Sequence, residues 1–201
     1  MHHLFAGDHR WIQLSGFSTE WDFVEAPSQL LEEWAWNYEV LQQFARSPDG
    51  TVIPADLVEK LRAARKFGKG LWVRHQMFYA SVSLNYYNQP PQQLDTTQML
   101  KELQREYSPF DYVPETFFQA SFGHLDGYSA MYYTYMWSLV IAKDLFSRFA
   151  SEGMLDPEVA QQYRAAVLAP GGSKDAAVMV EDFLGREYTF EAFAKWLNSG
   201  I

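Results

Sequence analysis

The sequence predicts an all-α fold, and three observations support this prediction. Apolar residues recur at three- and four-residue spacing in several long segments, proline and glycine separate these segments, and no segment reads as a β-strand. Hydrophobic residues make up 48% of the 201 residues and aromatic residues 17%, which is ample material for a core. The length suits one domain or two small ones, and we expect a single helical domain over residues 1–201, an irregular multi-helix bundle.

The first half of the chain contains three predicted helices. The first is expected to start at Pro27 and to stop at residues 47–50, Ser-Pro-Asp-Gly. Its apolar positions share helical spacing and are Leu30, Leu31, Trp34, Tyr38, Leu41 and Ala45. A second helix follows Pro54, with Leu57, Leu61 and Ala64 on one face, and a third runs from about 71 to 87. We expect the first of these to be one continuous amphipathic helix.

The second half contains a buried helix flanked by shorter ones. A short helix over 97–107 leads into the proline-containing connector 108–114, and loop is expected up to Gly127. Residues 129–150 are apolar on most faces, as in a buried central helix, and Gly153 is placed to end it. Asp156 and Pro157 start the next helix, residues 170–172 break it, and short helices are expected around 175–184 and 190–198.

The charge and the cysteine count exclude several classes of function. The net charge is −9 and there is no basic run, so affinity for nucleic acid or an anionic membrane has no electrostatic source. No stretch approaches the roughly 18 apolar residues of a membrane span. Without cysteine there are no disulfides, thiolate zinc ligands or cysteine nucleophile. We expect a cytoplasmic protein with neither nucleic acid nor membrane as a partner.

The histidines do not form a zinc-binding motif by themselves. In H-E-x-x-H, two histidines share one helical face and a glutamate acts as base. No histidine here is followed by glutamate, and none lies four residues from another. The five are His2, His3, His9, His75 and His124. A self-contained zinc site is therefore not encoded, and we expect His75 to pack or hydrogen-bond on its helix.

Glu25 is the carboxylate of most interest, because it stands directly before a strongly apolar helix. An acid at a helix start is common and is stabilised by the helix dipole, so position alone does not select a metal role. Glu32 would share a face with Glu25 if the helix began early enough. The alternative for Glu32 is an ordinary surface acid.

The segment around His124 is more unusual. Gly123 and Gly127 bracket His124 in a predicted loop, and Tyr128, Tyr132 and Tyr135 follow at positions that share one helical stripe. Tyrosine hydroxyls facing a cleft can donate hydrogen bonds to a carbonyl or a developing oxyanion. The alternative is a core stripe whose hydroxyls bond to the backbone. The glycine-bracketed histidine favours the functional interpretation.

Four stretches together resemble the thimet oligopeptidase family of zinc metallopeptidases, which includes oligopeptidase A and the bacterial peptidyl-dipeptidase. Residues 2–5, HHLF, are similar to the stretch just after the family's H-E-F-G-H motif. The other stretches are DFVEAPSQLLE at 22–32, FGHLDGY at 122–128 continuing to Trp137, and Tyr163-Arg164 with PGGSKDA at 170–176. The similarity spans essentially the whole chain, although residues 47–110 match more in helical character than in motif. It implies the C-terminal half of a zincin-like oligopeptidase catalytic domain.

The resemblance also implies a chemistry. Glu25 matches the third zinc ligand and Glu32 a supporting acid, while His124, Tyr128, Tyr132 and Tyr135 match groups that hold the peptide and stabilise the tetrahedral intermediate. The implied reaction is hydrolysis of short peptides by a zinc-bound water. The chain starts where the family's metal helix is finishing, so two histidine ligands and the glutamate base are expected to be absent.

Two functions follow from this resemblance. The first is a truncated portion of a zinc oligopeptidase, which binds no stoichiometric zinc and cleaves no peptide until a complementary segment joins it. The second is a stand-alone, non-catalytic module that binds peptides or partners. In either case, apolar surface that normally meets the missing part should be exposed, which favours self-association or a partner chain.

Overall fold

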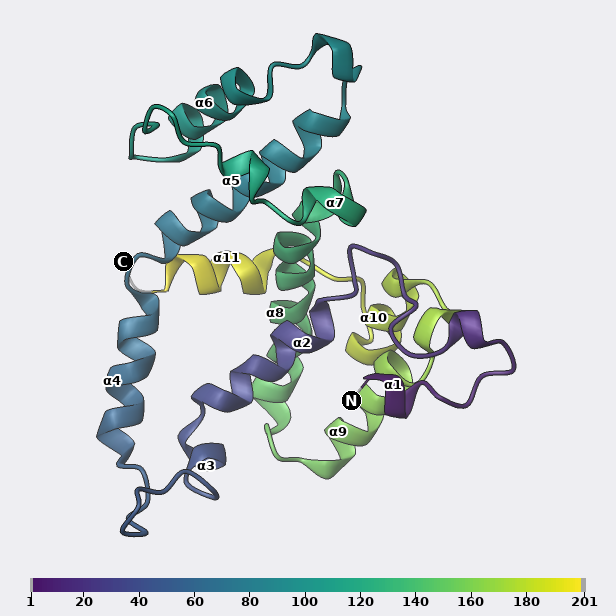
Figure 1. Cartoon of the computed structure of the whole chain (residues 1–201). Helices are drawn as coiled ribbons and strands as arrows, with labels where there is room; N and C mark the ends of the chain where they lie inside the picture. Colours follow the sequence, from purple (N-terminus) through teal and green to yellow (C-terminus); the bar gives the residue numbers. More distant parts are fainter. Residues whose placement is uncertain (1, 200–201) are drawn as a thin grey trace. The chain divides into compact units, whose positions relative to one another are not determined.

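The computed structural model describes residues 2–199 and confirms the all-α class (Figure 1). Within these residues, β-pairing is limited to an isolated antiparallel bridge between Arg46 and Val52. The helices are α1 His2–Phe5, α2 Ala26–Leu31, α3 Tyr38–Leu41, α4 Ala55–Lys66, α5 Lys69–Tyr87, α6 Thr96–Tyr107, α7 Leu125–Tyr128, α8 Thr134–Glu152, α9 Pro157–Tyr163, α10 Ala176–Leu184 and α11 Glu191–Asn198. Among the described residues, none of these helices has the length and apolar character needed to cross a membrane.

The chain divides into two compact units. Unit 1 combines residues 1–67 with 138–201, and unit 2 is the inserted stretch 68–137. Compactness of this kind does not measure whether a part folds independently, so the single domain over 1–201 stays a prediction.

The expectation of one continuous helix from Pro27 to Ala45 is wrong. After α2, the chain tightens into the 3₁₀ segment η2, Glu32–Trp36, and α3 then starts afresh. Asn37 causes the break: its backbone is extended at φ −102° and ψ 126°, and its side-chain oxygen accepts a hydrogen bond from Val40 N at 3.2 Å. A short amide side chain stabilises this N-cap conformation at the expense of a continuous helix.

The end of α8 confirms the two predicted stop and start signals. Gly153 adopts φ 126° and donates its N–H to Phe149 O at 2.9 Å, directly after the last helical residue. The Asp156 carboxylate then accepts from the N–H groups of Glu158 and Val159 at 2.8 and 3.0 Å, which caps α9. The predicted central helix begins later than expected, because residues 131–133 form the 3₁₀ turn η5 before α8.

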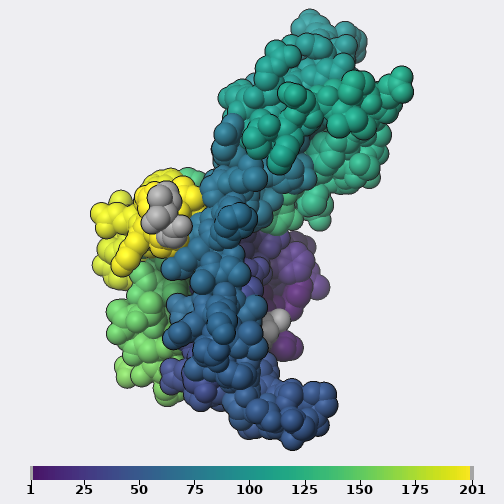
Figure 2. Space-filling view, turned by 90° about the vertical axis from the view of Figure 1, so that its left-hand side faces the viewer, coloured from purple at the N-terminus to yellow at the C-terminus, as the bar shows by residue number. Residues whose placement is uncertain are grey.

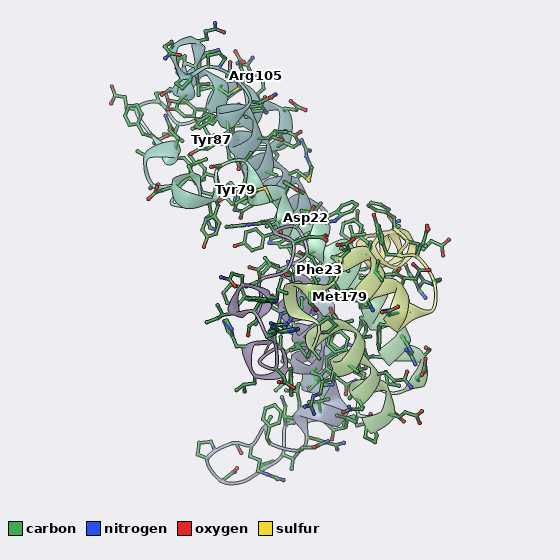
Figure 3. The ribbon with its side chains drawn as sticks, turned by 90° about the vertical axis from the view of Figure 1, so that its right-hand side faces the viewer. Asp22, Phe23, Tyr79, Tyr87, Arg105 and Met179 are labelled. Atoms are coloured by element: carbon green, nitrogen blue, oxygen red, sulfur yellow. The ribbon has the colours of Figure 1, made fainter. Side chains whose placement is uncertain are left out.

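Unit 1 has an apolar core formed by α2, α8, α9 and α10. Its fully buried side chains include Phe23, Leu30, Leu145, Met179 and Phe183, and Figure 3 labels Phe23 and Met179. Phe183 makes ring contacts with Phe149 and Tyr163 at centroid distances of 5.6 and 5.4 Å. Removing these rings from water supplies much of the stability of the unit.

Two adjacent charged residues of α8 are also buried in unit 1. Asp144 is 1% exposed, and its two carboxylate oxygens accept from Arg186 at 2.7 Å each, while Thr189 N donates to one of them at 2.7 Å. Lys143 forms an ion pair with Glu33. Burial lowers the pKa of Lys143, and the negative charge of Glu33 opposes that shift. These pairs connect α8 to the loop before α11 and to η2.

The Pro170-Gly171-Gly172 stretch of unit 1 has a steric reason for its glycines. A Cβ on Gly171 would collide with the carbonyl oxygen of Leu14, and one on Gly172 with that of Ser18. The N-terminal segment therefore approaches the η7 turn, Gly171–Ser173, backbone to backbone.

The α4 helix leaves most of its surface uncovered. Only Val58 is buried, whereas Leu57 and Leu61 are 44% and 42% exposed. In Figure 2, α4 is the blue surface that faces the viewer. The apolar face predicted for this helix is thus present but only partly packed.

Unit 2 is built on the packing of α5 against α6. Its apolar core is the set of buried residues Phe78, Val82, Leu100, Leu103 and Phe122. Asp95 caps α6 by accepting from Gln98 N at 2.9 Å. The rings of Tyr79, Phe118 and Tyr132 pack against this core.

Candidate functional site

The two segments with functional motifs fall in different units. Glu25 and Glu32 belong to unit 1, whereas His124, Tyr128, Tyr132 and Tyr135 all belong to unit 2.

Glu25 stands at the start of α2 with a fixed carboxylate. Its side chain makes no capping hydrogen bond to the helix backbone; instead, Ser28 Oγ donates to Glu25 Oε2 at 2.8 Å. Phe23, Ala26 and Pro27 around it are fully or nearly fully buried, which fixes this stretch of backbone. The Glu25 carboxylate is thus hydrogen-bonded at one oxygen. Stabilisation by the helix dipole needs no capping hydrogen bond, so that alternative for Glu25 stays open.

Glu32 and Glu33 face different partners. Glu32 is exposed and lies 3.5 Å from Arg65 Nη2, whereas Glu33 pairs with the buried Lys143. Arg65 also stacks over the Trp36 ring at 4.6 Å. The position of Glu32 matches its alternative interpretation as a surface acid, and a supporting role beside Glu25 remains a prediction.

The donor set of the described residues does not make a zinc site by itself. Catalytic zinc normally has three protein ligands. Within residues 2–199, no group of three His, Asp or Glu side chains lies close enough together to hold a metal ion. The role of Glu25 as a metal ligand stays a prediction.

Unit 2 gathers seven rings into what we call the aromatic cluster. Its members are Tyr79 of α5, Phe118, Phe122, His124, Tyr128, Tyr132 and Tyr135. His124 Nε2 lies 3.2 Å from the Tyr135 hydroxyl, within hydrogen-bond distance. The His124 ring meets Tyr132 edge to face at a centroid distance of 5.0 Å and lies 5.9 Å from Tyr128. The structure thus brings all four predicted residues of this segment together.

Helix α5 supplies the polar partners of the cluster. The Tyr132 hydroxyl donates to Gln76 Oε1 at 3.1 Å, and His75 Nε2 lies 2.6 Å from the Tyr79 hydroxyl. The prediction that His75 hydrogen-bonds on its helix is confirmed. Burial, reinforced by the neighbouring Tyr135 and Tyr79 phenols, raises the pKa of Tyr132 to about 12. Burial also raises the pKa of Tyr79. Both phenols therefore keep their protons at neutral pH.

The prediction that Tyr128, Tyr132 and Tyr135 share one continuous helical stripe is wrong. The backbone leaves the helical conformation within α7 at Gly127, φ 87°, and again directly after Tyr128 at Ser129, φ 49°. Tyr132 lies in η5 and Tyr135 in α8. The glycine permits one left-handed position, but Ser129 takes the other as a non-glycine residue, which costs free energy.

Ser83 of α5 holds the strained turn in place. Its side chain is 1% exposed, and its Oγ donates to Ser129 O at 2.6 Å. The same oxygen lies 3.4 Å from Tyr132 N and accepts from it. One buried hydroxyl therefore connects the backbone of Ser129 to that of Tyr132.

Sequence reasoning missed the contribution of α5. Gln76, Tyr79 and Ser83 lie at positions i, i+3 and i+7, which share one helical face. This polar stripe could have been noticed in a segment that matches the family more in helical character than in motif. Phe118 and Phe122 were also missed, because their ring contacts join the loop before α7 to α5.

The comparisons with known proteins place this chain among peptidases. The profile of Peptidase family M3 matches residues 1–199, and the chain belongs to this family. It is 32% identical over 200 residues to the mitochondrial intermediate peptidase of Homo sapiens, which covers 99% of this chain and 28% of that protein. It is 34% identical over 193 residues to the dipeptidyl carboxypeptidase of Salmonella typhimurium, covering 93% and 28%. It is 30% identical over 185 residues to oligopeptidase A of the same organism, covering 89% and 27%.

The family membership confirms the resemblance drawn from the motifs and makes peptide hydrolysis the reaction class of the family. The chain spans only about 28% of the length of these curated relatives. The family of the chain is therefore shown, whereas the activity of the whole protein is a proposal.

Proposed function

We propose that this chain supplies the peptide-holding groups and one carboxylate metal ligand of a zinc-dependent oligopeptidase. The observation that carries the proposal is the aromatic cluster, in which His124, Tyr128, Tyr132 and Tyr135 of an M3 sequence meet within one compact unit. The proposed substrates are short peptides.

The chemistry of the cluster suits a peptide backbone. Tyr132 stays protonated because its pKa is about 12, so its hydroxyl remains a hydrogen-bond donor at neutral pH. Tyr135 shares a hydrogen bond with His124, which can donate or accept at its ring nitrogens. Neutral donors of this kind can bind a peptide carbonyl and stabilise negative charge that develops on its oxygen. Tyr128 is half-exposed and able to meet a ligand directly.

Glu25 is proposed as the metal ligand of this part of the chain. Its carboxylate is oriented by Ser28, in the way that ligating carboxylates are held by hydrogen bonds. Glu32 is proposed as the supporting acid, although its present partner is Arg65. Because the described residues do not complete a zinc site, we propose that residues 1–201 alone neither bind zinc stoichiometrically nor cleave peptides.

Reconstitution tests the proposal. This chain would be mixed with a separately produced family segment that carries the H-E-F-G-H helix, and cleavage of a quenched fluorescent peptide would be followed with and without zinc. Zinc-dependent cleavage by the mixture, and by neither part alone, is the expected result. Glu25→Gln should abolish it, whereas the matched change Glu39→Gln at an exposed site of α3 should not. Equal activity of the Glu25→Gln mixture would contradict the role of Glu25.

A stand-alone peptide-binding module is the second candidate, favoured by the completeness of the aromatic cluster within unit 2. Exposed apolar side chains such as Leu4, Trp11 and Ile12 also fit a partner chain or self-association. Peptide binding that resists a chelator, with no cleavage in any mixture, would support this alternative.

The proposed compartment is the cytoplasm, on the basis of the absent cysteines, although a similar protein of Arabidopsis thaliana is named chloroplastic/mitochondrial.

A further inference from the structure

The hydroxyl group of Tyr132 carries a single proton, and the structure already commits that proton to a protein partner. The hydroxyl donates to Gln76 Oε1 at 3.1 Å. Because a phenol has only one O–H, it cannot donate to Gln76 and to a peptide oxygen at the same time. The proposed role of Tyr132 as a donor therefore requires this hydrogen bond to be exchanged for another.

The ring of Tyr132 is held by its neighbours and contributes little to such an exchange. Its centroid lies 5.4, 5.3 and 5.0 Å from those of Tyr79, Phe122 and His124, all three in edge-to-face contact. Figure 3 labels Tyr79, which belongs to α5. The exchange must therefore come from the hydroxyl proton and from Gln76.

Gln76 can serve the phenol from either end of its amide. Its Oε1 accepts hydrogen bonds and its Nε2 donates two. Within residues 2–199, the bond from Tyr132 is the one hydrogen bond of the Gln76 side chain, so Nε2 has no protein partner to lose. When the amide turns over, Nε2 can donate to the Tyr132 oxygen, and the hydroxyl proton is released to a ligand.

The alternative, in which only the hydroxyl proton moves, is unfavourable. Gln76 Oε1 would then face the Tyr132 oxygen with no proton between them, and an acceptor left without its partner costs free energy. With the amide turned over, the phenol accepts one hydrogen bond and donates another. Hydrogen bonds in such a chain polarise and strengthen one another.

We propose that Gln76 is a positioning residue for Tyr132: its amide changes from acceptor to donor when a peptide carbonyl binds, and this directs the Tyr132 proton to that carbonyl. The inference rests on the proposed function, because it assumes a peptide carbonyl at Tyr132. Gln76 itself needs no contact with the substrate.

Nuclear magnetic resonance of the glutamine side chains tests the change of roles directly. The full chain, ¹⁵N-labelled at glutamine, would be titrated with a capped tetra-alanine peptide, and the Gln76 signal would be assigned by its loss in Gln76→Glu. At saturation the Gln76 Nε2 protons should move downfield and exchange more slowly with water. In Tyr132→Phe, which lacks the phenol oxygen, they should do neither.

The same titration separates this inference from the proposed function. Peptide-dependent shifts of the His124 ring with an unchanged Gln76 signal would overturn the inference and leave the peptide-holding role standing, with Tyr132 acting as an acceptor. A titration in which neither signal changes would remove the peptide-holding role, and the role of Gln76 with it.

Kinetics of the reconstituted mixture supply a second test. Gln76→Glu keeps the length of the side chain and an acceptor, but its carboxylate has no N–H and holds the Tyr132 proton in a stronger, charge-assisted bond. The kcat for a quenched peptide should fall by about 10²-fold, as for loss of one oxyanion donor, with little change in KM. Gln76→Leu offers no acceptor and leaves the proton free, so its kcat should fall less.

The order of the two variants distinguishes positioning from packing. Because glutamate matches glutamine in size and shape, a purely structural role would make Gln76→Leu the more damaging change, and that order would overturn the inference even if the parent mixture cleaves. Gln92→Glu, at an exposed site of the 3₁₀ turn η3, Pro91–Gln93, should match the parent. Circular dichroism checks that all variants fold. If the parent mixture does not cleave, the proposed peptidase function fails and the titration alone decides the role of Gln76.

Discussion

Unit 1 and unit 2 both place polar groups among apolar side chains beside a helix, but the two units use different kinds of polar group. On α8 of unit 1, Lys143 and Asp144 are buried as charges, and each pairs with an opposite charge. In the aromatic cluster of unit 2, the polar atoms are neutral hydroxyls and an imidazole, and they pair with one another or with Gln76. The charged pairs hold elements of unit 1 together, whereas the aromatic cluster borders an open pocket of about 470 Å³.

The comparison teaches which polar groups are available for chemistry. A buried ion pair is satisfied internally, and either partner left alone would be strongly destabilising. A protonated phenol at a cavity can exchange one hydrogen-bond partner for another at small cost. The candidate peptide-binding groups therefore belong to the aromatic cluster, even though unit 1 contains the ion pairs.

The largest effect is expected from removing a core ring beneath the aromatic cluster. Phe78 is 6% exposed and belongs to the core of unit 2. Phe78→Ala should lower the free energy of unfolding by about 3–5 kcal/mol, through lost burial and the cavity left behind. Urea titration monitored by circular dichroism measures it. Phe110→Ala, at a side chain 69% exposed, is the control and should stay within about 0.5 kcal/mol of the parent.

The next effect tests the charged arrangement of unit 1. Asp144→Ala removes the acceptor of Arg186 and Thr189. Because the Arg186 side chain is 45% exposed and can be rehydrated, the loss should lie near the lower end for buried pairs, about 3 kcal/mol. Asp182→Ala breaks the exposed pair with Lys174 and should cost about 0–1 kcal/mol. Equal losses in the two variants would show that burial of Asp144 does not matter.

A smaller effect is expected at the strained turn of unit 2 between Tyr128 and Tyr132. Ser83→Ala removes the hydroxyl that bonds to Ser129 O, and should cost about 1 kcal/mol because a neutral hydrogen bond is lost. The strained turn should loosen, so peptide affinity should fall by more than stability alone explains. Ser83→Thr, which keeps the hydroxyl, should restore part of the affinity. Unchanged affinity in Ser83→Ala would show that the turn does not position Tyr128 or Tyr132.

The last effect is a pH dependence in unit 2, which appears only at strongly alkaline pH. Burial raises the pKa of Tyr132 to about 12 from an ordinary value of about 10. The folded chain thus holds this proton more tightly than the unfolded chain, so the associated stability is complete below pH 10 and is lost as the pH rises towards 12. Absorbance of phenolate against pH, with Tyr132→Phe subtracted, measures the transition. A difference curve centred near pH 10 would contradict burial of the hydroxyl.

The local signals of the sequence predicted much of the fold. Gly153 ends α8 and Asp156 caps α9, as predicted, because helix caps depend on a few neighbouring residues. Asn37 interrupts the first predicted helix because its side chain caps α3. The apolar periodicity continues through Asn37, so the pattern alone did not reveal the break. At Tyr128 the same periodicity concealed a backbone break at Gly127 and Ser129.

By itself the sequence determined the all-α class, the family and the segment that contains His124, Tyr128, Tyr132 and Tyr135, because helix period and motif spacing are local properties of the chain. Only the tertiary structure decided that α5 supplies Gln76, Tyr79 and Ser83 to these residues, and that Phe118 and Phe122 join them in the aromatic cluster. Contacts between segments far apart in the chain depend on which faces pack together. That choice comes from the total burial of apolar surface, which no single segment encodes.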